Sequence, residues 1–83
     1  MYQIIIRKRA KKFIDKLPQN EKKRIIMAIE KLPDSENVKK LKGYDDIFRL
    51  RVGDYRIIYT IDNGRLIITV IDAGNRGQIY KGL

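Results

Sequence analysis

The chain has 83 residues, which is enough for one domain but too few for two. It carries 19 Lys and Arg against 10 Asp and Glu, a net charge of +9, and such a basic excess suits nucleic acid, an anionic membrane surface or an acidic protein as a partner. The chain has neither Cys nor His, which excludes zinc fingers, disulfides, thiol nucleophiles and imidazole catalysis.

The first part of the chain predicts a short strand followed by two helices. Residues 2–6 are largely aliphatic, but this run is too short for a signal peptide or a membrane span, so a cytoplasmic protein is expected. Apolar residues then recur at helical spacing over residues 10–17. A second amphipathic helix is expected from an N-cap at Asn20 to about Leu32, where Pro33 stops it.

The second part of the chain predicts a loop and then a sheet. Residues 33–43 form a polar connection from which Val38 and Leu41 reach the core. Three strands are expected, over residues 47–52, 55–61 and 65–71. The Asp62-Asn63-Gly64 sequence predicts a hairpin between the last two strands. Residues 73–77 interrupt the chain, and residues 78–80 can add a short final strand.

This order of elements, β-α-α-β-β-β(β), predicts an α+β fold in a single domain over residues 1–83. Each predicted helix carries one apolar stripe, and such a stripe must be covered by another layer of structure. A helix hairpin packed on one face of a twisted antiparallel sheet satisfies that need. The opposite face of the sheet is then left for polar side chains.

Arginine residues interrupt two of the predicted strands. Because side chains alternate along a strand, Arg49 and Arg51 project to one side. A tight turn at Gly53-Asp54 places Arg56 on the neighbouring strand. A guanidinium group is a planar fork of donors that binds phosphate and stays charged at working pH. The three arginines therefore predict an anion-binding surface, and nucleic acid is the anion that the basic composition favours.

Other polar and aromatic residues have structural interpretations. The helix lysines fit a solvated surface, and they are Lys8, Lys11, Lys12, Lys22 and Lys23. Tyr55 and Tyr59 alternate onto the side that faces the helices and are expected in the core. The aspartates of the second half fall in predicted turns and at strand ends, which favours structural roles over metal binding.

Three segments together resemble the RelE/ParE superfamily of bacterial and archaeal toxins. They are Leu41-Lys42-Gly43, Phe48-Arg49-Leu50-Arg51-Val52-Gly53-Asp54-Tyr55-Arg56-Ile57-Ile58-Tyr59, and Arg76 with Ile79-Tyr80. The length of the chain and its predicted order of elements fit the same superfamily. The resemblance implies a RelE-like fold, which is similar to that of microbial ribonucleases.

The RelE-like branch implies the toxin of a type II toxin–antitoxin system. Such toxins are ribosome-dependent, metal-independent endoribonucleases that cut messenger RNA in the ribosomal A site, without a cofactor. By this resemblance Arg56, Arg76 and Tyr80 are catalytic, while Arg49 and Arg51 bind the RNA phosphates. It also implies three partners: an acidic antitoxin that wraps the toxin, the ribosome and messenger RNA.

The ParE-like branch is the alternative, since its members poison DNA gyrase without nuclease activity. The chain departs from many RelE-like toxins at Asn75, where they have His before the C-terminal Arg. Arginine is a poor proton acceptor because its pKa lies above about 12. The sequence therefore predicts a nuclease site in which no side chain is an obvious general base.

Overall fold

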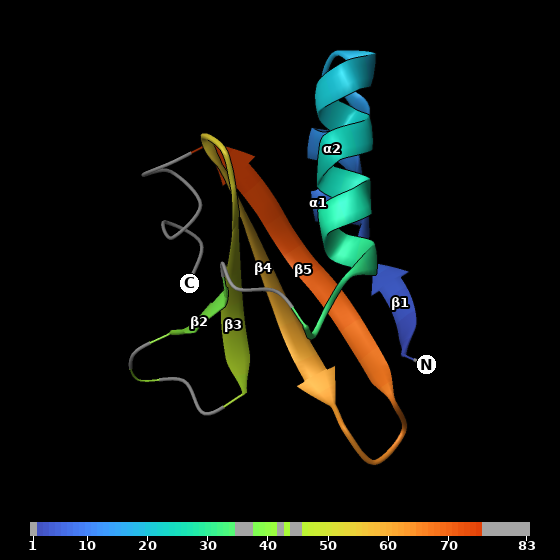
Figure 1. Ribbon diagram of the computed structural model, residues 1–83, viewed down its shortest axis with the longest axis vertical. Coiled ribbons are helices and arrows are strands. Elements are labelled where there is room, and N and C mark those ends of the chain that lie inside the picture. The colour runs from blue at the N-terminus through green and yellow to red at the C-terminus, as the bar shows by residue number, and fades with distance from the viewer. Residues whose placement is uncertain (1, 35–37, 42, 44–45, 76–83) are drawn as a thin grey trace.

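Two helices cover one face of a five-stranded sheet in the computed structural model, which describes residues 2–34, 38–41, 43 and 46–75 (Figure 1). In chain order the elements are β1 (Gln3–Ile6), α1 (Lys8–Asp15), α2 (Gln19–Glu30), β2 (Val38–Lys40), β3 (Ile47–Val52), β4 (Tyr55–Asp62) and β5 (Ile67–Asn75). The expected α+β fold class is confirmed. Within the described residues, neither helix is long and apolar enough to cross a membrane.

The strands lie in the order β1-β5-β4-β3-β2. Strands β2 to β5 pair antiparallel with their neighbours, whereas β1 pairs parallel to β5, with Ile4 opposite Ile68. The sheet is therefore mixed, and the expectation of a wholly antiparallel sheet was wrong for its first strand. The parallel pairing is possible because the helix hairpin carries the chain over one face before β2 begins.

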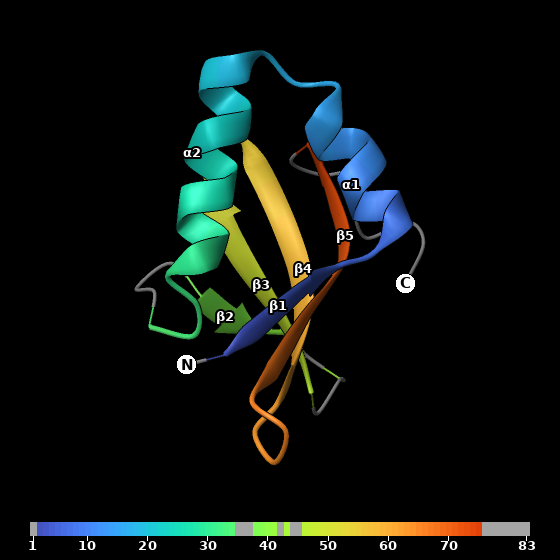
Figure 2. The same ribbon diagram turned by 90° about the vertical axis from the view of Figure 1, so that its right-hand side faces the viewer.

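Both helices lie on the same side of the sheet, α1 against β5 and α2 against β3 (Figure 2). Each helix buries its apolar stripe there, through Ala10 and Ile14 of α1 and Ile25 and Ile29 of α2. The sheet contributes the other half of the core with Leu50, Val52, Ile57, Tyr59, Ile68, Val70 and Ala73. The predicted assignment of Tyr59 to the core is confirmed, because its side chain is fully buried.

The boundaries of α2 differ from those predicted. Its N-cap is Pro18 rather than Asn20, and the Pro18 carbonyl accepts the N–H groups of Glu21 at 3.0 Å and Lys22 at 2.9 Å. The φ of −54° at Pro18 is compatible with the start of a helix, and no side chain caps this end of α2. At the other end α2 stops at Glu30, before the predicted Leu32.

Two segments predicted as connections are strands. Residues 38–40 form β2 because they pair with β3, Lys39 lying opposite Arg49. Val38 and Leu41 are half-buried, as expected. Strand β5 continues through residues 73–75, which pair with the beginning of β4, instead of breaking there. The strand predicted at residues 78–80 lies outside the described residues.

Candidate nucleic-acid interface

Arg49, Arg51 and Arg56 share the face of the sheet that is turned away from the helices. Arg51 lies directly opposite Arg56 across the β3–β4 ladder, and Arg49 lies opposite Ile58. Directly paired residues project to the same side of a sheet, so the register brings the three arginines together. The intervening Leu50 and Val52 are buried on the other face. The predicted alternation of this strand is confirmed.

The turn between β3 and β4 makes this pairing possible. Gly53 has a φ of +58°, a left-handed conformation that glycine adopts without the steric cost of a Cβ. The turn is confined to Gly53 and Asp54, so Val52 pairs directly with Tyr55. Because the connection is so short, Arg51 and Arg56 form the second residue pair of the β3–β4 ladder, counted from the turn.

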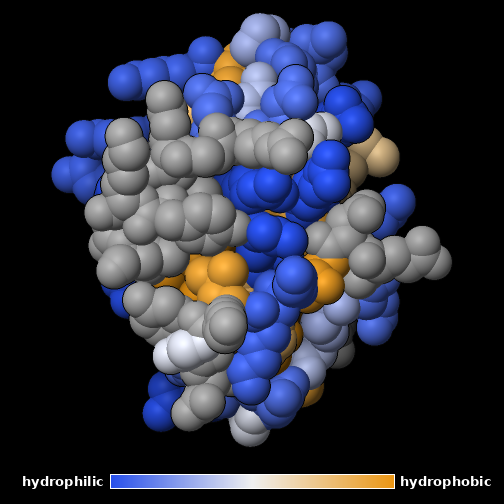
Figure 3. Space-filling view, turned by 90° about the vertical axis from the view of Figure 1, so that its left-hand side faces the viewer, coloured by the Kyte–Doolittle hydropathy of each residue, from blue (hydrophilic) through white to orange (hydrophobic). Residues whose placement is uncertain are grey.

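The arginines differ in how far they reach solvent. Arg51 is exposed, whereas Arg49 and Arg56 are half-buried within the outer face. Figure 3 looks at this face, where hydrophilic side chains run down the middle and hydrophobic surface shows on both sides of them. Half-buried guanidinium groups lose less side-chain entropy when they bind, because their stems are already packed. The surface suits an extended anion.

Strand β5 brings the last described residues beside this surface. Gly74 lies opposite Arg56, and Asn75 lies opposite Tyr55. Arg76 follows Asn75 in the sequence, but Arg76 and Tyr80 lie outside the described residues. The structure therefore brings together three of the five predicted site residues, and the placement of the other two stays a prediction.

The tyrosines of β4 face the core rather than this surface. Tyr59 stacks on Phe48 with ring centroids 5.6 Å apart, and its burial raises the pKa of its hydroxyl to about 12. Tyr55 meets Phe13 edge to face at 5.9 Å, and its pKa is raised by desolvation and then by a hydrogen bond with Glu21. Neither phenol is placed to stack on a base or to exchange a proton at neutral pH.

Asp72 has a structural role, as the sequence predicted for the aspartates. Its side chain is nearly buried; Oδ1 accepts the backbone N–H of Ala73 at 2.9 Å and lies 3.4 Å from Nε of Arg9. Asp62 accepts the N–H of Arg65 at 3.2 Å in the β4–β5 turn. These contacts hold α1 and the hairpin in place.

A groove between α1 and the end of β5 is a feature that sequence reasoning missed. Its volume is about 370 Å³, and it is lined by Arg9, Lys12, Phe13, Lys16, Asp72, Ala73, Gly74 and Asn75. Lys12 was expected only on a solvated helix surface. The i, i+3, i+7 spacing of Arg9, Lys12 and Lys16 was the available signal, because it places three cations on one side of a helix.

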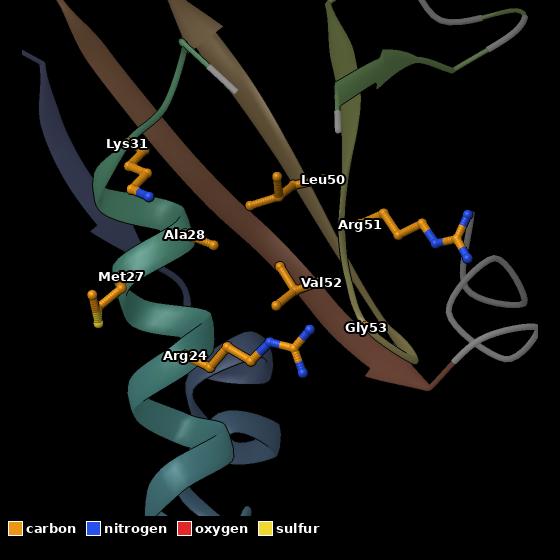
Figure 4. A pocket seen from close by; sticks show the side chains of 8 residues that line it. All are labelled: Arg24, Met27, Ala28, Lys31, Leu50, Arg51, Val52 and Gly53. Atoms are coloured by element: carbon orange, nitrogen blue, oxygen red, sulfur yellow. The ribbon is translucent and has the colours of Figure 1, made fainter. Parts of the chain in front are cut away.

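A second groove, of about 330 Å³, runs between α2 and β3 (Figure 4). Leu50, Val52 and Ala28 line it, and the guanidinium group of Arg24 reaches from α2 toward Gly53. The side chain of Arg51 points away from this groove, toward the other side of the sheet. The picture thus agrees with the strand register in placing Arg51 on the outer face.

Comparisons with known proteins place this arrangement in a known class. Residues 4–80 match the family model described as ParE toxin of type II toxin-antitoxin system, parDE. Toxin RelE3 of Methanocaldococcus jannaschii is 39% identical over 69 residues, which are 71% of this chain and 77% of that toxin. The protein is therefore a toxin of a type II toxin–antitoxin system.

Solved structures agree with the sequence comparison. A chain of the archaeal RelE-RelB complex from Pyrococcus horikoshii superposes with a TM-score of 0.74 at 29% identity, covering 93% of this chain and 97% of that one. A chain of the RelB-RelE complex from Methanococcus jannaschii gives a TM-score of 0.71 at 28% identity, covering 87% and 89%. The chain belongs to the RelE/ParE superfamily and to its RelE-like branch.

Proposed function

We propose that this toxin is a ribosome-dependent, metal-independent endoribonuclease that cuts messenger RNA in the ribosomal A site and thereby stops translation. The observation that carries the proposal is the cluster of Arg49, Arg51 and Arg56 on the outer face of the sheet. Three permanent cations on one rigid surface suit a phosphodiester backbone. Membership in the RelE-like branch supports the same reaction.

Metal-free cleavage of RNA makes three demands on a site. The 2′-hydroxyl must lose its proton to attack the phosphorus, the crowded phosphorane must be stabilised, and the departing 5′-oxygen must be protonated. We assign stabilisation of the phosphorane to Arg56 and Arg76, because preorganised cations aimed at developing charge are often the largest catalytic contribution. Arg49 and Arg51 hold the flanking phosphates. Tyr80 stacks on a base or exchanges a proton.

The first demand, removal of the proton from the 2′-hydroxyl, is the one that this chain meets least well. The chain has no His, and Glu21 and Glu30 lie on α2, behind the sheet from the arginines. A guanidinium group does not accept a proton at neutral pH. We therefore propose that the ribosome orients the RNA and supplies groups that the toxin lacks, so that cleavage depends on it. Such a toxin works in the cytoplasm.

The proposed regulator is a cognate antitoxin with an acidic segment that wraps the toxin. The matched structures from Pyrococcus horikoshii and Methanococcus jannaschii are complexes of RelE with RelB. A net charge of +9 accelerates association with an acidic partner and makes the rate of association sensitive to salt.

The alternative function is a gyrase poison without nuclease activity, and the match to a ParE family model favours it. The two functions stop different processes in a cell. After induction of the toxin, an early fall in amino-acid incorporation with continuing DNA synthesis supports the nuclease. Early arrest of DNA synthesis with continuing translation supports the gyrase poison and contradicts our proposal.

The decisive experiment maps messenger RNA 5′ ends on translating ribosomes. Wild-type toxin should give cuts phased with the reading frame, and Arg56→Ala should lower the cleavage rate by about 10²–10³-fold, as the loss of one preorganised donor does. Arg76→Ala and Tyr80→Ala should also abolish growth arrest while the protein stays folded. Arg65→Ala is the matched control, because that exposed arginine lies in the β4–β5 turn. Wild-type samples without phased cuts would refute the nuclease.

A further inference from the structure

The groove between α1 and β5 concentrates positive charge at one end of the sheet. Arg9, Lys12 and Lys16 line one wall, and the last residues of β5 form the other. Seven residues separate Arg9 from Lys16, so the cations extend over about 10 Å along the helix. Figure 2 shows α1 lying alongside this part of β5.

The lysines of this groove differ from their neighbours in how their charge is balanced. Nζ of Lys22 lies 2.9 Å from Asp15, and Nζ of Lys11 lies 4.0 Å from the same carboxylate. Lys12 and Lys16 have no acidic partner among the residues that the structure describes. Arg9 is held by Asp72 at the base of the groove. The guanidinium group of Arg9, paired with Asp72, therefore lines the same groove as the ammonium groups of Lys12 and Lys16, which have no acidic partner among the described residues.

The groove adjoins the candidate interface through a single strand. Gly74 lines the groove and is also the register partner of Arg56 on β4. Neighbouring strands lie about 4.8 Å apart, so the backbone of Arg56 runs one strand away from the groove wall. Because α1 packs on the face opposite the arginines, an RNA strand held at Arg56 reaches the groove by rounding the edge of β5 beyond Val70, where β1 no longer pairs among the described residues.

We propose that this groove binds backbone phosphate of the single-stranded RNA that the candidate interface holds, with Lys12 and Lys16 as the contacting residues. The inference rests on the proposed function, which it extends by a second RNA contact. Two features favour RNA over an acidic peptide. The wall from β5 offers the small Ala73 and Gly74 and the polar Asn75, and the ring of Phe13, which also lines the groove, already packs against Tyr55.

The test measures the salt dependence of RNA binding. A fluorescent single-stranded RNA with 2′-O-methyl groups, which block cleavage, is titrated with toxin by anisotropy at several KCl concentrations. Each phosphate contact on single-stranded RNA contributes about 0.7 to the slope of log K against log salt. The Lys12→Gln/Lys16→Gln variant should lower that slope by about 1.4 and weaken binding at low salt by about tenfold.

Lys23→Gln is the matched control, because Lys23 is an exposed lysine of α2 that does not line this groove. Lys23→Gln removes one positive charge where the double variant removes two, so its slope should equal that of the wild type apart from half of the general effect of lost charge. Arg9 is left intact in the test, since its removal would strand the buried carboxylate of Asp72. Circular dichroism of each variant confirms that exposed substitutions leave the fold unchanged.

Three outcomes would overturn the inference. The first is a wild-type slope and affinity in the double lysine variant. The second is weakened binding of the acidic antitoxin with unchanged RNA binding, which would assign the groove to a peptide. The third is a wild-type toxin that does not bind the RNA even at low salt. Failure of the proposed function is distinguishable, because it appears as missing cuts on ribosomes whatever the lysine variant does to the slope.

Discussion

Arg51 and Arg56 face each other directly across the β3–β4 ladder, so two guanidinium groups share one side of a tight hairpin. Like charges in directly opposed positions destabilise a sheet. Such a pair is a cost to folding unless an anion lies between the two groups. The Arg51–Arg56 pair lies at the centre of the candidate interface, which indicates that this surface is suited to binding an anion at some cost in stability.

The first prediction follows from this repulsion. Arg51→Thr should raise the free energy of unfolding by about 0.2–1 kcal/mol, because it removes the opposed charge and keeps a residue that favours strands. The same variant should be less toxic. Urea unfolding at low and high salt measures the change, and the gain should shrink at high salt, where the charges are screened. A variant that is less stable than wild type at low salt would contradict this account.

The second prediction concerns Asp72. Asp72→Ala should lower the free energy of unfolding by about 1.5–3 kcal/mol, because it removes a charged acceptor from the N–H of Ala73 and a partner from Arg9. Asp72→Asn keeps an oxygen acceptor and should lose less. Denaturant midpoints of the two variants measure the difference. If both lose equally, the hydrogen bond to Ala73 is not what stabilises this end of β5.

The third prediction concerns Tyr59 and pH. Burial raises the pKa of its hydroxyl from 10.0 to about 12, so the folded protein holds a proton that the unfolded chain loses first. Its contribution to stability is complete below pH 10 and is lost as the pH rises through 12. Stability of the wild type should therefore fall more steeply over this range than that of Tyr59→Phe.

The Tyr59→Phe variant should be as stable as the wild type near pH 7. The hydroxyl of Tyr59 is buried and has no hydrogen-bond partner among the described residues, so its removal leaves no orphaned group. The ring of phenylalanine keeps the stacking on Phe48. Thermal unfolding at pH 8 checks this expectation, and a large loss there would point to a hidden role for the hydroxyl.

The fourth prediction concerns the turn between the arginine strands. Gly53→Ala should destabilise the fold by about 1–2 kcal/mol, because a φ of +58° is strained for a residue with a Cβ. The new methyl group would also meet the guanidinium group of Arg24, whose Nη1 lies 3.3 Å from the ideal Cβ position. Gly53→Asn should lose less, since asparagine tolerates this conformation. Equal losses in the two variants would show that backbone strain is not the cause.

Much of the arginine surface could be predicted from local sequence. Alternation over residues 47–52 separates Arg49 and Arg51 from the buried Leu50, and the Gly53-Asp54 turn sets the register that adds Arg56. Both signals act over a few residues, which is why a single sequence contains them. The assignments of Arg76 and Tyr80 stay predictions, because these residues lie outside the described part of the chain.

Features that depend on distant parts of the chain could not be predicted in this way. An aliphatic run at residues 2–6 indicates a strand, but nothing in it specifies β5 as its partner. The groove with Lys12 and Lys16 exists only because α1 packs beside the end of β5. Local patterns also missed the extension of β5, whose residues 73–75 are ordered by their pairing with β4.

The pairing of β1 with β5 affects the order in which the sheet can form while the chain is being synthesised. Strand β1 leaves the ribosome first, but its partner is the last strand of the described chain to be synthesised. The apolar faces of β1 and of the helix hairpin α1–α2 stay uncovered until most of the polypeptide has been made, because β5 is needed to close the sheet. The β1–β5 pair is therefore the last part of the sheet to close, whereas the β3–β4 hairpin that carries the arginines can pair before β5 has been made.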